Sequence, residues 1–261
     1  MFENLNCPTC SKESYATVPV LRVLEKLDEF FSVNDLAAAG RLLEYWEREA
    51  IILNDKRGLL EILNEEIGYF RRTSDKEKGI SAVDRAIELV YELGVENNTS
   101  TGTVFLNAAT TLRSFKETAR AMEFYETAKR IYDVCLDEKD FRLAAYYNNV
   151  SSAYLDLGQP EKAEECCFKA LDILKGNKKY LGERAVTHVS LAHLYYDLDN
   201  LDGRPYDHMD MAWELLSSED IERDGNFAFV CSKCYPSFGF FGYFEYEKKL
   251  KAWMESIYEG N

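Results

Sequence analysis

Apolar and small residues recur every three or four positions along almost the whole chain, with polar residues between them. The segments ISAVDRAIELV, RAMEFYETAKRIY and EKAEECCFKALDIL show this period most clearly. It predicts amphipathic helices, and no alternating β pattern extends beyond a few residues. We therefore predict an all-α protein with short polar loops and about twelve helices, near residues 20–31, 35–53, 57–72, 75–94, 100–115, 117–136, 140–157, 160–175, 179–198, 205–218, 225–235 and 241–258.

Small residues also repeat at an interval of 42 positions, in two registers seven residues apart. One register holds Ala86, Ala128, Ala170 and Ala212, and the other holds Gly79, Ala121, Ala163 and, less regularly, Pro205. Two small residues seven apart lie on one helix face, where they let a second helix approach closely. The interval predicts a stack of helical hairpins.

One unit of this repeat, residues 144–175, resembles the tetratricopeptide repeat (TPR). The resemblance rests on Tyr147, Val150, Ser151, Tyr154, Gly158, Ala163, Ala170 and Leu171. The longer 42-residue unit is similar to the kinesin-light-chain type, in a bacterial-type protein, although the family's common proline at the end of the unit is missing. The resemblance covers residues 20–258 and implies a right-handed α-α superhelix, a TPR solenoid of about five to six helical hairpins.

We accordingly expect an irregular segment at residues 1–18 and a single TPR-like helical repeat domain at residues 19–261. Its units would lie near residues 19–56, 57–98, 99–139, 140–178 and 179–220, with residues 221–261 as a C-terminal cap.

The resemblance further implies that the first helix of each hairpin lines a concave groove. Equivalent positions would form a ladder of Asn64, Asn107, Asn149 and Ser190, able to hydrogen-bond the backbone of an extended peptide. Arg71, Arg72 and Arg113 lie about two turns further along their helices and would contact a carboxylate or phosphate. The alternative is that the asparagines are solvated or bind neighbouring helix ends.

Two C-x-x-C pairs, Cys7 with Cys10 and Cys231 with Cys234, raise the alternative of a zinc or thiol protein. The pairs are 221 residues apart, and we expect the two ends of a stack to lie far from each other. Cys231 and Cys234 also sit in the apolar run FAFVCSKCY, which favours burial as small hydrophobic residues. We therefore expect no metal and no cofactor.

Nine aromatic residues lie between positions 227 and 246, interrupted by Pro236 and two glycines. We interpret this segment as a long turn between the last two helices, which caps the final repeat. The alternative is an exposed interface for a homodimer or adaptor, made by Phe238, Phe240, Phe241, Tyr243 and Phe244.

The formal charge of −15 argues against direct binding of nucleic acid or of an anionic membrane. The N-terminus lacks the pattern of a signal peptide and no segment is apolar enough to span a bilayer, so we expect a cytoplasmic protein. No hydrolase, metalloprotease or nucleotide-binding motif occurs. The sequence thus predicts a non-enzymatic scaffold that binds a protein or peptide ligand, one version being a receptor for a signalling peptide, as in bacterial regulators built on similar repeats.

Overall fold

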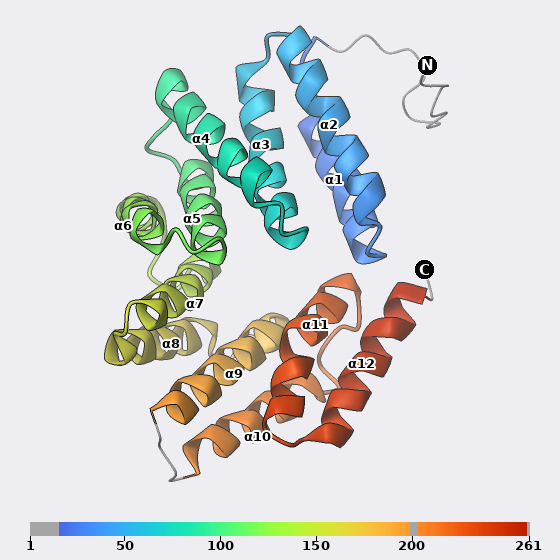
Figure 1. Ribbon diagram of the computed structural model, residues 1–261, viewed down its shortest axis with the longest axis vertical. Coiled ribbons are helices and arrows are strands. Elements are labelled where there is room, and N and C mark those ends of the chain that lie inside the picture. Colours follow the sequence, from blue (N-terminus) through green and yellow to red (C-terminus); the bar gives the residue numbers. More distant parts are fainter. Residues whose placement is uncertain (1–15, 199–202, 260–261) are drawn as a thin grey trace.

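The computed structural model describes residues 16–198 and 203–259, and within them the chain forms twelve α-helices, one short 3₁₀ helix and no strand (Figure 1). The first ten helices begin and end within two residues of their predicted bounds, so the all-α prediction is confirmed. Most of the predicted irregular segment, including Cys7 and Cys10, lies outside the described residues. The helices are α1 (Val20–Ser32), α2 (Leu36–Ile52), α3 (Lys56–Arg72), α4 (Lys76–Leu93), α5 (Thr99–Ser114), α6 (Thr118–Cys135), α7 (Phe141–Asp156), α8 (Pro160–Leu174), α9 (Leu181–Asp197), α10 (Arg204–Leu216), α11 (Gly225–Phe240) and α12 (Phe244–Glu259), with η1 (Lys178–Tyr180) before α9.

Most of the tight turns between paired helices share one geometry. The second residue after the helix end adopts a left-handed conformation at Asn34, Asn54, Ser74, Lys116, Gly158 and Gly242. The next backbone N–H then bonds a carbonyl five residues back, as from Asp75 to Phe70. This pattern satisfies carbonyls that would otherwise lack partners at the helix end. It reverses the chain within three residues and sets the two helices of a hairpin side by side.

The prediction of a long turn before the last helix was wrong, because α11 continues through Pro236 to Phe240. A proline inside a helix costs about 3 kcal/mol. The continuing helix buries Phe238 completely and leads to Phe241, which is 8% exposed. Burial of one large apolar side chain contributes about 1.5–3 kcal/mol, so the two together outweigh the proline. The chain reverses instead at residues 241–243, around Gly242.

The 42-residue repeat of small residues is confirmed as a packing feature. Ala86, Ala128, Ala170 and Ala212 are all 0% exposed and occupy equivalent places in α4, α6, α8 and α10. In the second register, a Cβ added to Gly79 would lie 2.6 Å from Cε2 of Phe115. The small residues thus mark the closest helix contacts, as the interval predicts.

The odd-numbered helices form a closed inner ring. Each of α1, α3, α5, α7, α9 and α11 packs against the next, and α11 packs against α1, while α6, α8, α10 and α12 lie outside (Figure 1). A Cβ added to Gly225 at the start of α11 would lie 2.8 Å from Cα of Ser32 at the end of α1. The expectation that the two ends of the stack lie far apart was therefore wrong. A small constant rotation per hairpin, repeated around the stack, brings its ends together.

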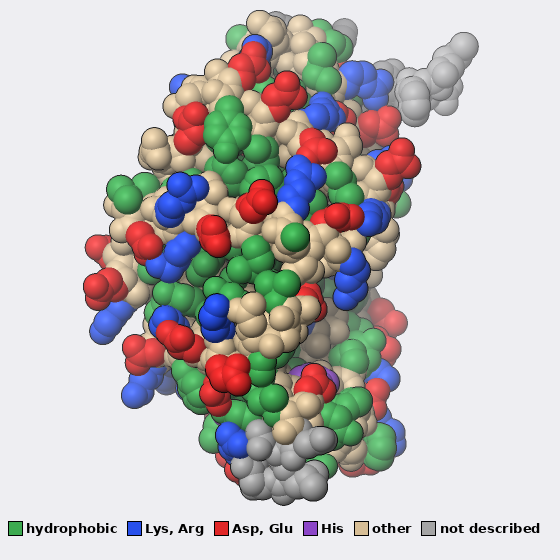
Figure 2. All heavy atoms as spheres, turned by 60° about the vertical axis from the view of Figure 1, so that its left-hand side comes forward, with side chains coloured by type: hydrophobic (Ala, Val, Ile, Leu, Met, Phe, Trp, Pro, Cys, Tyr) green, Lys and Arg blue, Asp and Glu red, His purple; other side chains and the backbone are tan. Residues whose placement is uncertain are grey.

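The apolar core is divided among neighbouring hairpins, as a repeat stack requires. One buried cluster extends from α3 to α8, a second joins α1 to α3, and a third joins α9 to α12. Ion pairs such as Lys76–Glu117 and Lys178–Asp220 connect successive hairpins. Acidic and basic side chains are interspersed over the face shown in Figure 2. No helix among the described residues is both long and apolar enough to cross a membrane.

Candidate ligand-binding surface on the inner ring

The first two ladder residues contact each other. Asn107 on α5 donates a hydrogen bond from Nδ2 to Oδ1 of Asn64 on α3, at 2.9 Å. Asn64 in turn donates to Oε1 of Glu65, at 3.1 Å. Both asparagines are partly exposed. The structure therefore brings Asn64 and Asn107 together in one chain of amide and carboxylate groups.

The other two ladder residues bond within their own helices. Asn149 donates from Nδ2 to the carbonyl oxygen of Ala145, at 2.9 Å, and Ser190 donates to that of Val186, at 3.1 Å. Their donors are therefore engaged by local backbone, which is the usual competing role of such side chains in helices. The ladder is continuous only between α3 and α5.

Lys233 on α11 takes the position after Ser190 by its spacing, and it was not among the predicted ladder residues. It follows Ser190 by 43 residues, an interval equal to that between Asn64 and Asn107. The spacing alone could have found it, but the surrounding apolar run was interpreted only as core. Lys233 is exposed to solvent, yet burial lowers the pKa of its ammonium group, as does the charge of Arg71. Part of the Lys233 side chain is therefore accessible to solvent, although protein atoms lie around its ammonium group.

The predicted arginines differ in their partners. Arg71 donates from Nη1 to Oγ1 of Thr111, at 3.2 Å, and burial lowers the pKa of its guanidinium. Thr111 itself is 0% exposed and donates to the carbonyl oxygen of Ile67, which fixes it against α3. Arg113 instead pairs with Asp156 of α7, Nη1 to Oδ2, at 3.2 Å. Arg71 thus keeps a charge without a carboxylate partner among the described residues, whereas that of Arg113 is compensated.

Open space lies beside the middle of α3. A Cβ added to Gly68 would have no atom of another segment within 4 Å. Gly68 lies four residues after Asn64, on the same side of the helix. The backbone of α3 is therefore accessible to a ligand between Asn64 and Arg71.

The cysteines of the second C-x-x-C pair are core residues. Cys231 is 0% and Cys234 1% exposed, and both belong to the apolar cluster of α9 to α12. Burial raises the pKa of each thiol to about 12, so both are protonated at neutral pH. No group of three or more potential metal-binding side chains occurs in residues 16–198 and 203–259.

The predicted aromatic interface is divided by the structure. Phe238 and Phe241 are buried and Tyr243 is half-buried, so these three act mainly in the packing of α11 and α12. Phe240 is 57% and Phe244 61% exposed. Only these last two present large apolar surface to solvent.

The three histidines connect α9 to its neighbours. The Nδ1 atoms of His188 and His208 lie 2.9 Å apart, so one ring donates a hydrogen bond to the other. Burial, followed by the charge of His208, lowers the pKa of His188 to about 4. His193 contacts Oγ of Ser237 through Nε2, at 2.8 Å, and burial lowers its pKa. Uncharged rings with protein partners fit a packing role at neutral pH.

Comparison with known proteins agrees with the fold. Residues 144–173 match the family profile of the tetratricopeptide repeat. No curated protein sequence matches the chain. The structure of BtubC (BKLC) from P. vanneervenii is similar over 86% of this chain and 90% of that one, with 20% identity and a TM-score of 0.56. A kinesin-light-chain protein with nearly identical TPR-like repeats, from Podosopora anserina, covers 76% of this chain and 94% of its own, with 12% identity and a TM-score of 0.54.

A Rap protein in complex with Competence and Sporulation Factor is similar over 95% of this chain and 77% of that one. The identity is 12% and the TM-score is 0.62. These similarities concern the arrangement of the helices. The chain therefore carries a tetratricopeptide repeat at residues 144–173, and its fold is the all-α solenoid of tetratricopeptide-repeat proteins, including those of the kinesin-light-chain type.

Proposed function

We propose that this chain binds a peptide, or a peptide-like segment of a protein, on the inner ring and performs no catalysis. The observation that carries the proposal is the hydrogen-bonded pair Asn64 and Asn107 beside the open space at Gly68. Amides present donors and acceptors that match a peptide backbone without selecting its side chains. The similar Rap structure contains a bound factor, which supports the same use of this fold.

The test compares capture by the wild type with capture by the double variant Asn64→Ala/Asn107→Ala. The matched control is Asn97→Ala, because Asn97 is an exposed asparagine in the loop between α4 and α5. Each bait is incubated with the peptide fraction of native lysate, and captured peptides are identified by mass spectrometry and then titrated by calorimetry. Circular dichroism establishes that all three baits are folded.

Two lost hydrogen bonds of about 0.5–1.5 kcal/mol each correspond to a loss of about fivefold to 150-fold in affinity. The proposal expects this loss in the double variant and unchanged binding in the control. Equal affinity for all three proteins would refute a role of the asparagine pair in binding.

A second candidate function is self-association through exposed aromatic side chains. Tyr196 and Phe240 lie edge to face with ring centroids 5.0 Å apart, and they are 48% and 57% exposed. Exposed aromatic clusters are common at protein interfaces. Sedimentation velocity of the wild type and of Phe240→Ser over a hundredfold concentration range tests this function. A dimer in the wild type that dissociates in the variant supports it, and a monomer throughout refutes it.

A further inference from the structure

From Glu61 to the end of α3, charges on the inner side of the helix are separated by sign. Glu61 and Glu65 lie towards its N-terminal half, Gly68 follows, and Arg71 and Arg72 end the helix. At about 100° per residue, all five lie within an arc of about 120°. Arg57, in the first turn of α3, lies within the same arc. From Glu61 onward, this side of α3 therefore carries acidic side chains, then open space, then basic side chains.

The acidic end is a place where like charges converge. Burial raises the pKa of Glu61 and of Glu65 above the ordinary value. The charges of Asp28 on α1 and of Glu61 raise the pKa of Glu65 further, against the hydrogen bond from Asn64. A positive group placed among these carboxylates would relieve their mutual repulsion.

The basic end joins α3 to α11 through one aromatic ring. Nζ of Lys233 lies 4.2 Å from the ring centroid of Phe229, and Cζ of Arg72 lies 5.5 Å from the same centroid. Arg72 also donates to Oδ1 of Asn34, at 2.8 Å, and Arg71 donates to the neutral Thr111. Within residues 16–198 and 203–259, none of these three cations forms an ion pair. Three converging cations in a chain of net charge −15 favour a bound anion.

The separation of the two ends fits a short extended peptide. At about 1.5 Å per residue along a helix, Glu65 and Arg71 are about 9 Å apart and Glu61 and Arg72 about 16 Å. An extended peptide advances about 3.3 Å per residue, so three to five residues span this range. Its backbone would pass Gly68, where a Cβ would meet nothing within 4 Å, and the amides of Asn64 and Asn107.

We propose that the inner side of α3, completed by Lys233 of α11, binds the two charged termini of a free peptide about three to five residues long. The amino group lies at Glu61 and Glu65, and the terminal carboxylate lies between Arg71 and Lys233. This inference rests on the proposed function and adds the length, the end groups and the direction of the ligand.

The experiment uses three pools of random tetrapeptides, which differ only at their ends. One pool has free termini, one is N-acetylated and one is C-amidated. Each pool is incubated with the full chain, and retained peptides are quantified by affinity selection and mass spectrometry. We expect at least tenfold less retention of either blocked pool by the wild type, because each block removes one charge–charge contact.

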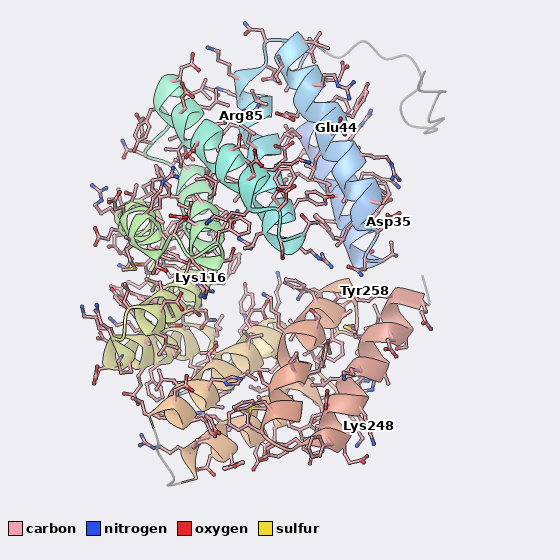
Figure 3. The ribbon with its side chains drawn as sticks, in the orientation of Figure 1. Asp35, Glu44, Arg85, Lys116, Lys248 and Tyr258 are labelled. Atoms are coloured by element: carbon pink, nitrogen blue, oxygen red, sulfur yellow. The ribbon has the colours of Figure 1, made fainter. Side chains whose placement is uncertain are left out.

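Variants locate the two contacts. Lys233→Gln is expected to remove the preference for a free carboxylate and to keep the preference for a free amino group, whereas Glu65→Gln is expected to do the reverse. Lys248→Gln is the matched control, since Lys248 is an exposed lysine of the outer helix α12 (Figure 3). Gly68→Leu should abolish retention of all three pools. Because leucine is a better helix former than glycine, this variant should not lose helical stability.

The outcomes separate the inference from the proposed function. Equal retention of free and blocked pools would overturn the inference and leave peptide binding intact. Retention of no tetrapeptide pool would overturn the inference, while the lysate capture with Asn64 and Asn107 variants would still decide the proposed function. Normal retention by a folded Gly68→Leu variant would overturn the proposed position of the ligand.

Discussion

The buried carboxyl group of Glu66 makes the stability of the fold depend on pH. Glu66 on α3 is 4% exposed and faces Glu47 of α2 and Arg85 of α4, which pair with each other, Nη1 to Oε1, at 2.5 Å. Burial, and then the charge of Glu47, raise the pKa of Glu66 to about 8, while Arg85 acts in the opposite direction. In the folded chain Glu66 is therefore protonated at neutral pH and can donate a hydrogen bond to Glu47.

The raised pKa fixes the direction of the effect. In the unfolded chain the pKa of Glu66 has its ordinary value of 4.5, whereas folded Glu66 keeps its proton up to about pH 8. Its stabilising contribution is complete below about pH 4.5 and is lost as the pH rises to about 8. Each rise of one pH unit in this window lowers the free energy of unfolding by at most about 1.4 kcal/mol. The change from about pH 5.5 to about pH 7.5 therefore lowers it by at most about 2.7 kcal/mol.

Glu66→Gln provides the comparison, because an amide donates the same hydrogen bond at every pH. Urea unfolding followed by circular dichroism, at about pH 5.5, 6.5 and 7.5, gives the free energy of unfolding of each protein. We expect the wild type to lose stability relative to Glu66→Gln over this range. Glu44→Gln, which removes an exposed glutamate of α2, should follow the wild type (Figure 3). Parallel pH profiles of wild type and Glu66→Gln would refute the assignment of a proton to Glu66.

Three further predictions test the packing, the ring closure and the thiols. Ala128→Leu, at a 0% exposed position of α6, should lower the free energy of unfolding by about 1–3 kcal/mol in urea, whereas Ala252→Leu on the exposed side of α12 should change it by less than about 0.5 kcal/mol. Arg72→Ala removes the guanidinium that contacts the ring of Phe31 on α1 and the ring of Phe229 on α11. It should therefore weaken the junction of α1 with α11 and increase the maximum dimension in small-angle X-ray scattering; an unchanged dimension would contradict a closing role. The exposed thiol of Cys135 should react with a disulfide reagent in the native protein, whereas the buried thiols of Cys231 and Cys234 should react only in denaturant, and fast reaction of all three would contradict their burial.

The helices could be predicted from the sequence because their signals are local. The period of apolar residues, the small residues at intervals of 42 and the turn residues Asn34, Asn54 and Gly158 act within one helix or between helices adjacent in the chain. The continuation of α11 through Pro236 could not be predicted. Proline locally disfavours a helix, but here the burial of Phe238 and Phe241 against other helices contributes more free energy than the proline costs.

Closure of the ring could not be predicted from the sequence pattern either. It depends on the sum of small rotations over all hairpins, which no single motif encodes. The same limit applies to the candidate site, because Lys233 and Arg72 meet at Phe229 only when α11 reaches α3. By contrast, Asn64 and Asn107 lie on neighbouring hairpins. Their interval of 43 residues was therefore sufficient to predict that they lie close together.

Photo-crosslinking tests peptide binding on the inner ring most directly. Short peptides with free termini and a central photoreactive residue are irradiated with the wild-type chain, and the modified residues are identified by mass spectrometry. Binding on the inner ring predicts adducts on α3 and α5, around Asn64, Gly68 and Asn107, and their loss in excess unlabelled peptide. Adducts confined to the outer helices, or to the exposed aromatic residues Phe240 and Phe244, would contradict it.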